Sequence, residues 1–277
     1  ESDVVVLVVG GSSARDFKTK YIATGAATVS NDKDEILLDM DCGEGYDRST
    51  LDLLGDQEKL MQALIETGKP LVVIYIQGRT LKMNLAAEKA NALLTAWYPG
   101  GEGGHGIADV LFGDYNPAGR LPVSIARNEG QLPIYYSKGR QRNYMDGEAN
   151  ALYSFGYGLS YTKFDYSNLE IKPGNGKDVL QTVSCTVTNT GDRDGHEVVQ
   201  LYIRDMVASV AQAPILLKAF ERISLKKGES KKVTFNLGKK ELSIYNMNLE
   251  EVVEPGEFKV MVGAASNDIR LNGKFEL

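Results

Sequence analysis

The fold is decided by the stretch Ala96-Trp-Tyr-Pro-Gly-Gly-Glu-Gly-Gly-His105, which continues as Ala108-Asp-Val-Leu-Phe-Gly-Asp-Tyr-Asn-Pro-Ala-Gly-Arg-Leu-Pro-Val123. An apolar run ends in a glycine-rich loop, a short helical segment follows, and Asn-Pro-Ala-Gly turns the chain into another strand-like run. This order predicts a strand, a loop, a helix and a strand. In that architecture, ligands bind beyond the carboxyl ends of parallel strands.

The segments before this stretch alternate in the same way. Val4 to Val9 is a continuous apolar, β-branched run before Gly10-Gly11, which is typical of a strand covered on both faces. The alternation predicts an α/β domain over residues 1–128 with right-handed crossovers and a mainly parallel sheet. The further expected elements are a helix over Asp56 to Thr67, a strand over Leu71 to Ile76, a short helix over Leu81 to Glu88, a strand over Ala92 to Trp97, a helix over Gly104 to Phe112, and a fourth strand or extended edge over Leu121 to Ile125.

After Phe164 the hydrophobic period changes to two, which is typical of half-buried strands. Several short alternating strands between turn residues predict an all-β, immunoglobulin-like sandwich over residues 165–277. Residues 129–164 are rich in Gly, Tyr and charge. We expect an ordered aromatic linker packed on both neighbours, because flexible linkers lack so many aromatic residues. The expected strands of the sandwich are Thr182–Thr188, Val198–Ile203, Lys232–Leu237 and Gly256–Val262.

The composition excludes several classes of function. With 277 residues, 43% of them hydrophobic, the chain can hold two globular domains. The net charge of −6 argues against nucleic acid as a partner. No apolar run approaches the ~20 residues that are needed to span a bilayer. The acidity is concentrated before Phe164, and it fits a carboxylate-lined cleft and a solvated acidic surface equally well.

Cysteine and histidine are scarce and scattered. Cys42 and Cys185 lie in different predicted domains, as do His105 and His196, so we expect neither a disulfide nor a histidine metal site or triad. A serine-hydrolase GxSxG motif is absent from the sequence. The chain opens directly on a core strand, without a start methionine or signal peptide. We therefore expect a fragment or a processed product.

A long connection follows the first strand. About 45 residues without a sustained period separate it from the helix at Asp56, and compact domains rarely keep such a connection unless it has a function. It leaves the carboxyl end of a strand, which favours a functional loop over a mobile, solvated insertion. Its charged residues include Arg15, Asp16, Asp39, Asp41, Glu44, Asp47 and Arg48.

Three motifs in order carry a resemblance to a known family. The stretch from Ala96 to Val123 resembles the second domain of glycoside hydrolase family 3, the β-glucosidases and β-xylosidases that hydrolyse terminal sugars with retention. Gly43-Glu44-Gly45-Tyr46-Asp47-Arg48 resembles the acid/base loop of that family. Leu152-Tyr-Ser-Phe-Gly-Tyr-Gly-Leu-Ser-Tyr161 resembles the start of its fibronectin type III-like domain. The resemblance implies an incomplete α/β sandwich domain followed by a fibronectin III-like sandwich.

The resemblance assigns the acid/base role to Glu44. Retaining hydrolysis needs two carboxyl groups, and a Glu between two glycines lies on backbone that can approach a substrate closely. In the family the nucleophile is an Asp on a preceding (β/α)8 barrel, to which nothing here corresponds; Asp39, Asp41 and Asp47 do not match its position. We therefore expect this chain alone to be inactive. The resemblance implies a β-linked oligosaccharide or glycoside substrate, no cofactor, and a periplasmic or secreted location.

Other candidate residues have both a functional and a structural interpretation. Asp47-Arg48 could be an ion pair that shapes the loop, which we favour, or a contact to substrate. Tyr46 could offer its ring to a sugar or pack within the loop, and Arg15 is a weaker binding candidate. Glu102 in the glycine-rich loop would repel phosphate, so a capping role at the helix start is the better interpretation.

Two further hypotheses stay open. One is a non-catalytic carbohydrate-binding or scaffold protein built from the same two domains. The other is a nucleotide-binding α/β module, which the glycine-rich loop supports poorly because it lacks the P-loop Lys and the GxGxxG spacing. We expect the sandwich to buttress the first domain, with carbohydrate binding by the sandwich as the lesser alternative.

Overall fold

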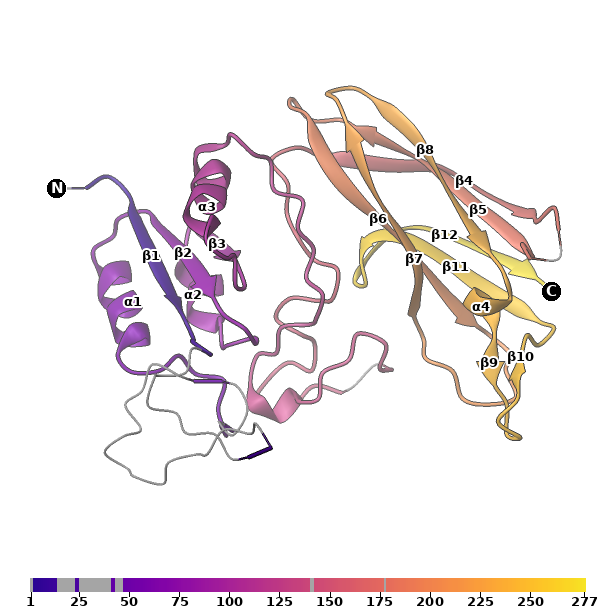
Figure 1. Cartoon of the computed structure of the whole chain (residues 1–277), viewed down its shortest axis with the longest axis horizontal. Helices are drawn as coiled ribbons and strands as arrows, with labels where there is room; N and C mark the ends of the chain where they lie inside the picture. Colours follow the sequence, from indigo (N-terminus) through magenta and orange to yellow (C-terminus); the bar gives the residue numbers. More distant parts are fainter. Residues whose placement is uncertain (1, 14–22, 25–40, 43–46, 140–141, 177) are drawn as a thin grey trace. The chain divides into compact units, whose positions relative to one another are not determined.

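The computed structural model describes residues 2–13, 23–24, 41–42, 47–139, 142–176 and 178–277 (Figure 1). The chain forms two compact units. The α/β unit comprises Glu1–Leu111 and Ile125–Leu132, and the sandwich unit comprises Phe112–Ser124 and Pro133–Leu277. Residues 129–132 of the expected linker thus belong to the α/β unit and residues 133–164 to the sandwich unit.

The α/β unit contains a three-stranded parallel sheet in the order β1-β2-β3. Each strand is followed by a helix, as the alternating pattern predicted. The short helix α2 begins at Asn84, three residues later than expected. The elements are β1 Val5–Gly10, α1 Gln57–Glu66, β2 Leu71–Ile76, α2 Asn84–Lys89, β3 Ala92–Thr95 and α3 Gly103–Phe112, and the 3-10 helix η1 Glu129–Gln131 completes the unit.

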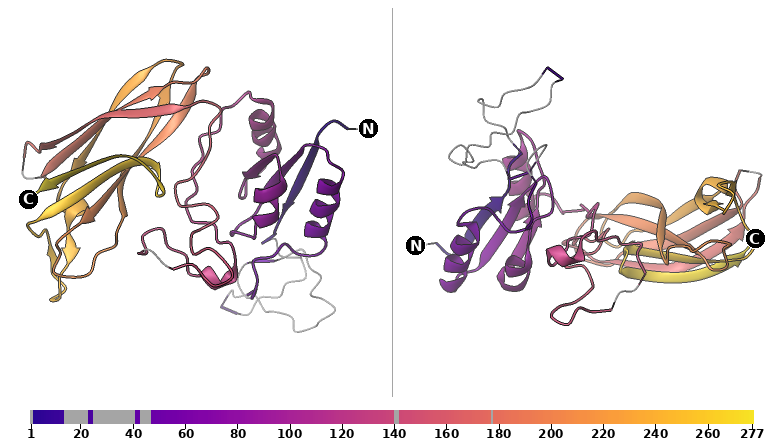
Figure 2. Two further views of the ribbon diagram at one scale, coloured as in Figure 1. Left: turned by 180° about the vertical axis from the view of Figure 1, so that it is seen from behind. Right: turned by 90° about the horizontal axis from the view of Figure 1, so that it is seen from below.

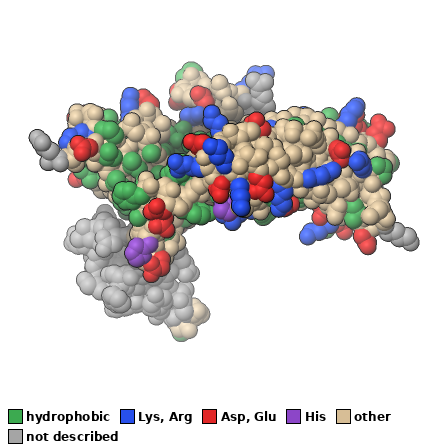
Figure 3. Space-filling model, turned by 90° about the horizontal axis from the view of Figure 1, so that it is seen from above, with side chains coloured by type: hydrophobic (Ala, Val, Ile, Leu, Met, Phe, Trp, Pro, Cys, Tyr) green, Lys and Arg blue, Asp and Glu red, His purple; other side chains and the backbone are tan. Residues whose placement is uncertain are grey.

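The expectation that both faces of the first strand are covered is wrong. Leu7 and Val9 are buried, but Val6 and Val8 are 51% and 54% exposed. Side chains alternate between the two faces of a strand, so the face of β1 that carries Val6 and Val8 is left uncovered by the part of the chain that the structure describes. Hydrophobic side chains also gather on the face of the α/β unit that Figure 3 shows, whereas charged side chains of both signs are scattered over the sandwich unit.

The expected fourth strand over Leu121 to Ile125 does not join this sheet. Leu121 instead exchanges backbone hydrogen bonds with the sandwich unit: its N–H donates to the Tyr157 carbonyl at 2.9 Å, and the Gly156 N–H donates to its carbonyl at 2.8 Å. Pro122 has no N–H and cannot continue a ladder. The apolar run is therefore divided, and Ile125 and Ala126 are buried in the α/β unit.

Besides the two-stranded antiparallel sheet β10-β9, the sandwich unit contains two larger antiparallel sheets, in the orders β12-β11-β6-β7 and β4-β5-β8 (Figures 1 and 2). Between them lies one hydrophobic core, in which Val187, Leu201 and Val260 are fully buried. The four predicted strands are confirmed as β5, β6, β8 and β11. The elements are β4 Phe164–Pro173, β5 Gln181–Asn189, β6 Gly195–Asp205, β7 Leu216–Leu225, β8 Ser230–Leu237, α4 Lys239–Leu242, β9 Ile244–Tyr245, β10 Glu251–Val252, β11 Glu257–Ala265 and β12 Asp268–Glu276.

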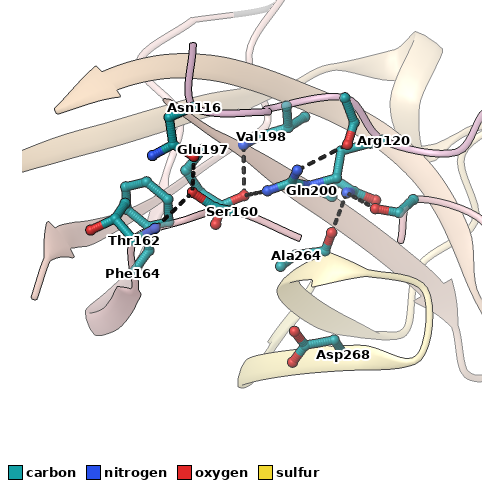
Figure 4. Close-up of polar contacts among 12 residues, drawn as sticks. Asn116, Arg120, Ser160, Thr162, Phe164, Glu197, Val198, Gln200, Ala264 and Asp268 are labelled. Atoms are coloured by element: carbon teal, nitrogen blue, oxygen red, sulfur yellow. Dashed lines mark hydrogen bonds and ion pairs between the residues drawn. The ribbon is translucent and has the colours of Figure 1, made fainter. Parts of the chain in front are cut away.

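Aromatic residues between 133 and 161 pack on the sandwich. The ring of Tyr136 stacks on Phe155 at 4.3 Å between centroids and meets Tyr202 edge-on at 6.3 Å. The amide of Gln200 donates to the Ala264 and Gly156 carbonyls, as Figure 4 shows for Ala264. These contacts attach residues 133–161, which have little regular secondary structure, to the rest of the sandwich unit.

A buried ion pair fixes residues 112–124 to the sandwich. Arg120 Nη2 lies 2.7 Å from Glu197 Oε1, and the two side chains are 8% and 3% exposed (Figure 4). Glu197 Oε1 also accepts from the Val198 N–H at 2.7 Å, and Arg120 Nη1 donates to the Gly119 carbonyl at 3.0 Å. Each of the two charged groups therefore makes a hydrogen bond to the backbone in addition to the ion pair, which offsets part of the cost of burying it.

Glu197→Ala should lower the free energy of unfolding of the sandwich unit by about 3–5 kcal/mol, because it leaves the Arg120 guanidinium buried without its carboxylate. Urea unfolding followed by circular dichroism measures this loss. Lys172→Ala is the matched control, since Lys172 and Glu170 form an exposed pair 3.1 Å apart whose removal should cost about 0–1 kcal/mol. Equal effects of the two substitutions would contradict the prediction.

Candidate functional site

The carboxyl ends of the three parallel strands meet at one edge of the α/β unit. Gly10 ends β1, where the Gln57 side chain accepts from its N–H at 2.8 Å and donates to its carbonyl at 3.0 Å. Beyond β2 and β3, the Gln77 N–H donates to the Trp97 carbonyl at 3.1 Å. This edge is where α/β sheets bind ligands.

The long connection after β1 returns to this edge. The N–H of Asp41 donates to the Ser12 carbonyl at 2.8 Å, and Arg79 Nη2 donates to the Asp41 carbonyl at 2.8 Å. The next residue, Cys42, is also held here, because its Sγ lies 3.5 Å from the Tyr98 hydroxyl and 3.8 Å from the Ser12 carbonyl. Asp41 and Cys42 are thus fixed to the ends of all three strands.

Arg48 forms an ion pair, but its partner is Asp41 and not Asp47, so the expected pairing is wrong. Arg48 Nη1 lies 3.3 Å from Asp41 Oδ2, and the side chains of Arg48 and Asp41 are 17% and 1% exposed. Arg48 Nη2 also donates to the Asp52 carbonyl at 2.8 Å, which favours the structural interpretation of this side chain.

Two glycines allow this close packing. A Cβ at Gly11 would lie 2.2 Å from Asp41 Oδ2, and a Cβ at Gly78 would lie 2.5 Å from the Tyr98 ring. Any side chain at either position would displace its neighbour. The glycine at position 11 is therefore explained by the Asp41 carboxylate, which packs directly on the backbone at the end of β1.

Trp97 and Tyr98 follow β3 and were not singled out by the sequence analysis. Trp97 has a φ of 52°, a left-handed conformation that is costly for a residue with a bulky side chain. Tyr98 is 49% exposed, and desolvation, followed by its contact with the Cys42 thiol, raises the pKa of its hydroxyl. Their position at the end of a predicted parallel strand is the signal that could have identified them.

The structure places the predicted cysteines and histidines, but it does not describe three of the candidate site residues. Glu44, Arg15 and Tyr46 lie outside the described residues. Both cysteines are buried and free. His105 lies in the α/β unit and His196 in the sandwich unit, as expected from their separation in the sequence.

Glu102 stands just before α3, as expected for a capping residue, and its carbonyl accepts from the Gly106 N–H at 3.1 Å, but its side chain does not cap the helix. Its Oε2 lies 2.6 Å from His105 Nδ1, so in the described part of the chain the carboxylate bonds to a side chain of the first turn and not to a backbone N–H. The two side chains are three residues apart on a helix, where they are neighbours. Both are 87% exposed, and the pair is a surface feature.

An open depression of about 760 Å³ lies on the sandwich unit. The Arg270 guanidinium lies over the Tyr166 ring at 4.8 Å and is bonded to Asp268 at 2.8 Å. The guanidinium therefore covers a face of the Tyr166 ring on which a sugar could otherwise stack. Its lining residues are Lys163, Phe164, Asp165, Tyr166, Ser167, Thr188, Thr190 and Arg270.

The segment after Arg48 is fixed by further contacts within the α/β unit. Glu129 Oε1 accepts from the Leu51 N–H at 2.6 Å, and Lys82 Nζ lies 3.1 Å from Asp52 Oδ1. The Lys82 N–H also donates to the Leu51 carbonyl at 2.6 Å.

Within the residues described, no helix is long and apolar enough to cross a membrane, and no three His, Cys, Asp or Glu side chains form a group that could hold a metal.

Two family models match the chain. Residues 1–161 match the glycosyl hydrolase family 3 C-terminal domain, and residues 197–266 match the fibronectin type III-like domain. The first match covers more than half of the chain and contains the whole strand edge described above.

Similar proteins are longer than this chain. A β-xylosidase of Formosa agariphila is 42% identical over 275 residues, which cover 96% of this chain and 34% of that protein. A periplasmic β-glucosidase of Salmonella typhimurium is 42% identical over 248 residues, covering 84% of this chain and 32% of that protein. The crystal structure of a β-glucosidase from Listeria innocua in complex with glucose matches 99% of this chain and 36% of that chain, with a TM-score of 0.83 and 34% identity. The chain thus spans about a third of the length of these relatives.

Glu129→Gln should destabilise the α/β unit at neutral pH, because a charged acceptor makes a stronger hydrogen bond to the Leu51 N–H than a neutral one. This bond lowers the pKa of the Glu129 carboxyl below its ordinary 4.5. The stabilisation is thus present above pH 4.5 and is lost as the pH falls through the lowered pKa. Urea unfolding followed by tryptophan fluorescence should show the two proteins converging in acid. A difference that stayed constant down to pH 3 would contradict this explanation.

Proposed function

Because the chain belongs to glycosyl hydrolase family 3, we propose that it supplies the acid/base carboxylate, Glu44, to a retaining, exo-acting β-glycosidase. The substrate would be a terminal, non-reducing β-linked sugar, with glucose first and xylose next. The β-glucosidases and β-xylosidases among the similar proteins support this substrate class.

The anchoring of the residues beside Glu44 is the observation that carries the proposal. Asp41 and Cys42, just before it, are bonded to Ser12 and Tyr98 at the carboxyl edge of the parallel sheet. Arg48, just after it, is paired with Asp41. The described residues on either side of Glu44 in the sequence therefore lie where α/β sheets bind ligands, at the carboxyl ends of the parallel strands.

The proposed chemistry needs a second carboxylate. In retaining hydrolysis one carboxylate attacks the anomeric carbon, and the other protonates the departing oxygen and then takes a proton from water, with about 5–5.5 Å between the two groups. Glu44 would carry out both proton transfers, which requires a raised pKa in the closed site. The nucleophile would be an Asp of an N-terminal barrel, in keeping with relatives about three times as long as this chain.

A periplasmic or secreted location is part of the proposal. It is supported by the similarity to the periplasmic β-glucosidase of Salmonella typhimurium. The proposed chemistry requires neither a metal nor an organic cofactor, because both proton transfers and the nucleophilic attack use carboxyl groups.

The test compares the 277-residue chain with a longer protein in which a barrel precedes it. Hydrolysis of aryl β-glucoside and β-xyloside should occur only in the longer protein, with the β-anomer as the first product by NMR. Glu44→Gln there should lower kcat/KM for a substrate with a poor leaving group by about 10²–10⁴-fold, the usual contribution of general acid catalysis.

Two results would overturn the proposal. One is turnover by the isolated chain that Glu44→Gln abolishes, since the nucleophile would then lie in this chain. The other is oligosaccharide binding by the isolated chain that is indifferent to Glu44→Gln, together with no hydrolysis in the longer protein. That outcome would replace the proposal with a carbohydrate-binding scaffold.

A further inference from the structure

We propose that Tyr98 is a substrate-binding residue, whose exposed ring stacks on the apolar face of a sugar. This inference rests on the proposed function, because a sugar is the ligand only if the chain serves a β-glycosidase. Tyr98 follows β3, at the carboxyl ends of the parallel strands, where α/β sheets bind ligands. Tyr98 and the residues that hold it all lie in the described part of the α/β unit.

The backbone on both sides of Tyr98 is fixed. The Trp97 carbonyl accepts from the Gln77 N–H at 3.1 Å, and the Gln77 side chain donates to the last side chain of β3 at 3.0 Å. On the other side, Pro99 packs on the first residue of α3, since a Cβ at Gly103 would lie 2.5 Å from the proline ring. Tyr98 therefore stands on a short connection that is attached at each end.

The side chain of Tyr98 is held in one orientation but is not buried. Its ring lies against the backbone at Gly78, where a Cβ would lie 2.5 Å from the ring and from the hydroxyl. The hydroxyl lies 3.5 Å from Cys42 Sγ. Nevertheless, 49% of Tyr98 is exposed. An aromatic ring that is already fixed loses little further side-chain entropy when a ligand packs on it, so this ring is a preorganised binding surface.

Stability does not explain this arrangement. Trp97 adopts a left-handed φ of 52°, and Gly78 has no side chain of its own to bury. Both features cost free energy. A tyrosine that served stability alone would recover that cost by burying its ring, which Tyr98 does only in part. Strained backbone beside an exposed aromatic side chain is better explained by binding, because such strain is retained at ligand sites.

A pyranose ring suits this surface. Its C–H groups form an apolar face that can pack on an aromatic ring, while its hydroxyl groups stay in water or bond to polar neighbours. The Tyr98 hydroxyl already contacts the Cys42 thiol, so the ring is the part that meets the sugar. Such packing acts on the bound substrate and on the transition state alike. Its loss should therefore raise KM and leave kcat nearly unchanged.

The experiment uses the complete hydrolase, in which a barrel precedes this chain, and a β-linked disaccharide of glucose. Tyr98→Ala should raise KM by about 3–10-fold and leave kcat within about twofold, whereas Tyr98→Phe keeps the ring and should leave both within about twofold. The Kd of the non-hydrolysed, sulfur-linked disaccharide, measured by calorimetry, should rise by the same factor in Tyr98→Ala. Tyr245→Ala is the matched control and should change none of these values, because Tyr245 is an exposed tyrosine on β9 of the sandwich unit.

Several outcomes would refute the stacking role. They are an unchanged KM and Kd in Tyr98→Ala, an equal rise in Tyr98→Phe, and a fall in kcat without a rise in KM. Circular dichroism shows whether Tyr98→Ala is folded. If it is not, Tyr98→Leu keeps an apolar side chain without the flat ring and must give the same rise in KM and Kd.

Glu44→Gln measured beside these variants separates the two proposals. If Glu44→Gln leaves hydrolysis of a substrate with a poor leaving group unchanged, the proposed function fails, whatever Tyr98→Ala does. If Glu44→Gln lowers that rate but Tyr98→Ala changes neither KM nor the calorimetric Kd, only the role of Tyr98 fails. The Kd does not depend on turnover, so it tests Tyr98 even in a protein that hydrolyses nothing.

Discussion

Parallel pairing of β1, β2 and β3 is the constraint on which the candidate site depends. Because the three strands run in one direction, their carboxyl ends and the turns that follow them reach a common edge. Gly11, Gln77 and Trp97 come together there from positions far apart in the sequence. Without this pairing, the residues that hold Asp41 and Cys42 would not lie together, and this part of the long connection would not be attached to the ends of the strands.

Close packing of side chains on the backbone, more than an open cavity, characterises the carboxyl ends of these strands. Gly11 and Gly78 bring a carboxylate and a tyrosine ring against the backbone, and a buried charge is tolerated there. This arrangement costs stability, as does the left-handed backbone of Trp97. Functional sites are where such costs are normally retained.

The sequence predicted the parts of the fold that depend on local patterns. The apolar run Leu71–Ile76 and the alternation in Gln181–Asn189 specify strands by themselves. β4 was missed because Asn168 has a φ of 51° and a register shift follows Ser167, so its alternation is interrupted. The exposed valines of β1 could not be foreseen, since an apolar run does not say what covers it.

The candidate site was predictable as a place but not as a set of contacts. A long connection leaving a strand end indicated where chemistry would lie. The choice of Asp41 over Asp47 as the partner of Arg48 depends on the three-dimensional return of the chain, which adjacency in the sequence does not reveal. Tyr98 was overlooked because an aromatic residue beside Pro99 is ordinary in a turn.

The separation of the two hydrophobic cores has a consequence for cooperativity. Val73 and Met61 are buried in the α/β unit, whereas Val187 and Leu201 belong to the core of the sandwich. The two-state approximation holds for single domains and is not assured for a chain with two cores. Trp97, the only tryptophan, reports on melting of the first unit, while most strands that contribute to circular dichroism lie in the second. If tryptophan fluorescence and circular dichroism gave different unfolding transitions, the two units would be unfolding separately, each with its own free energy of unfolding.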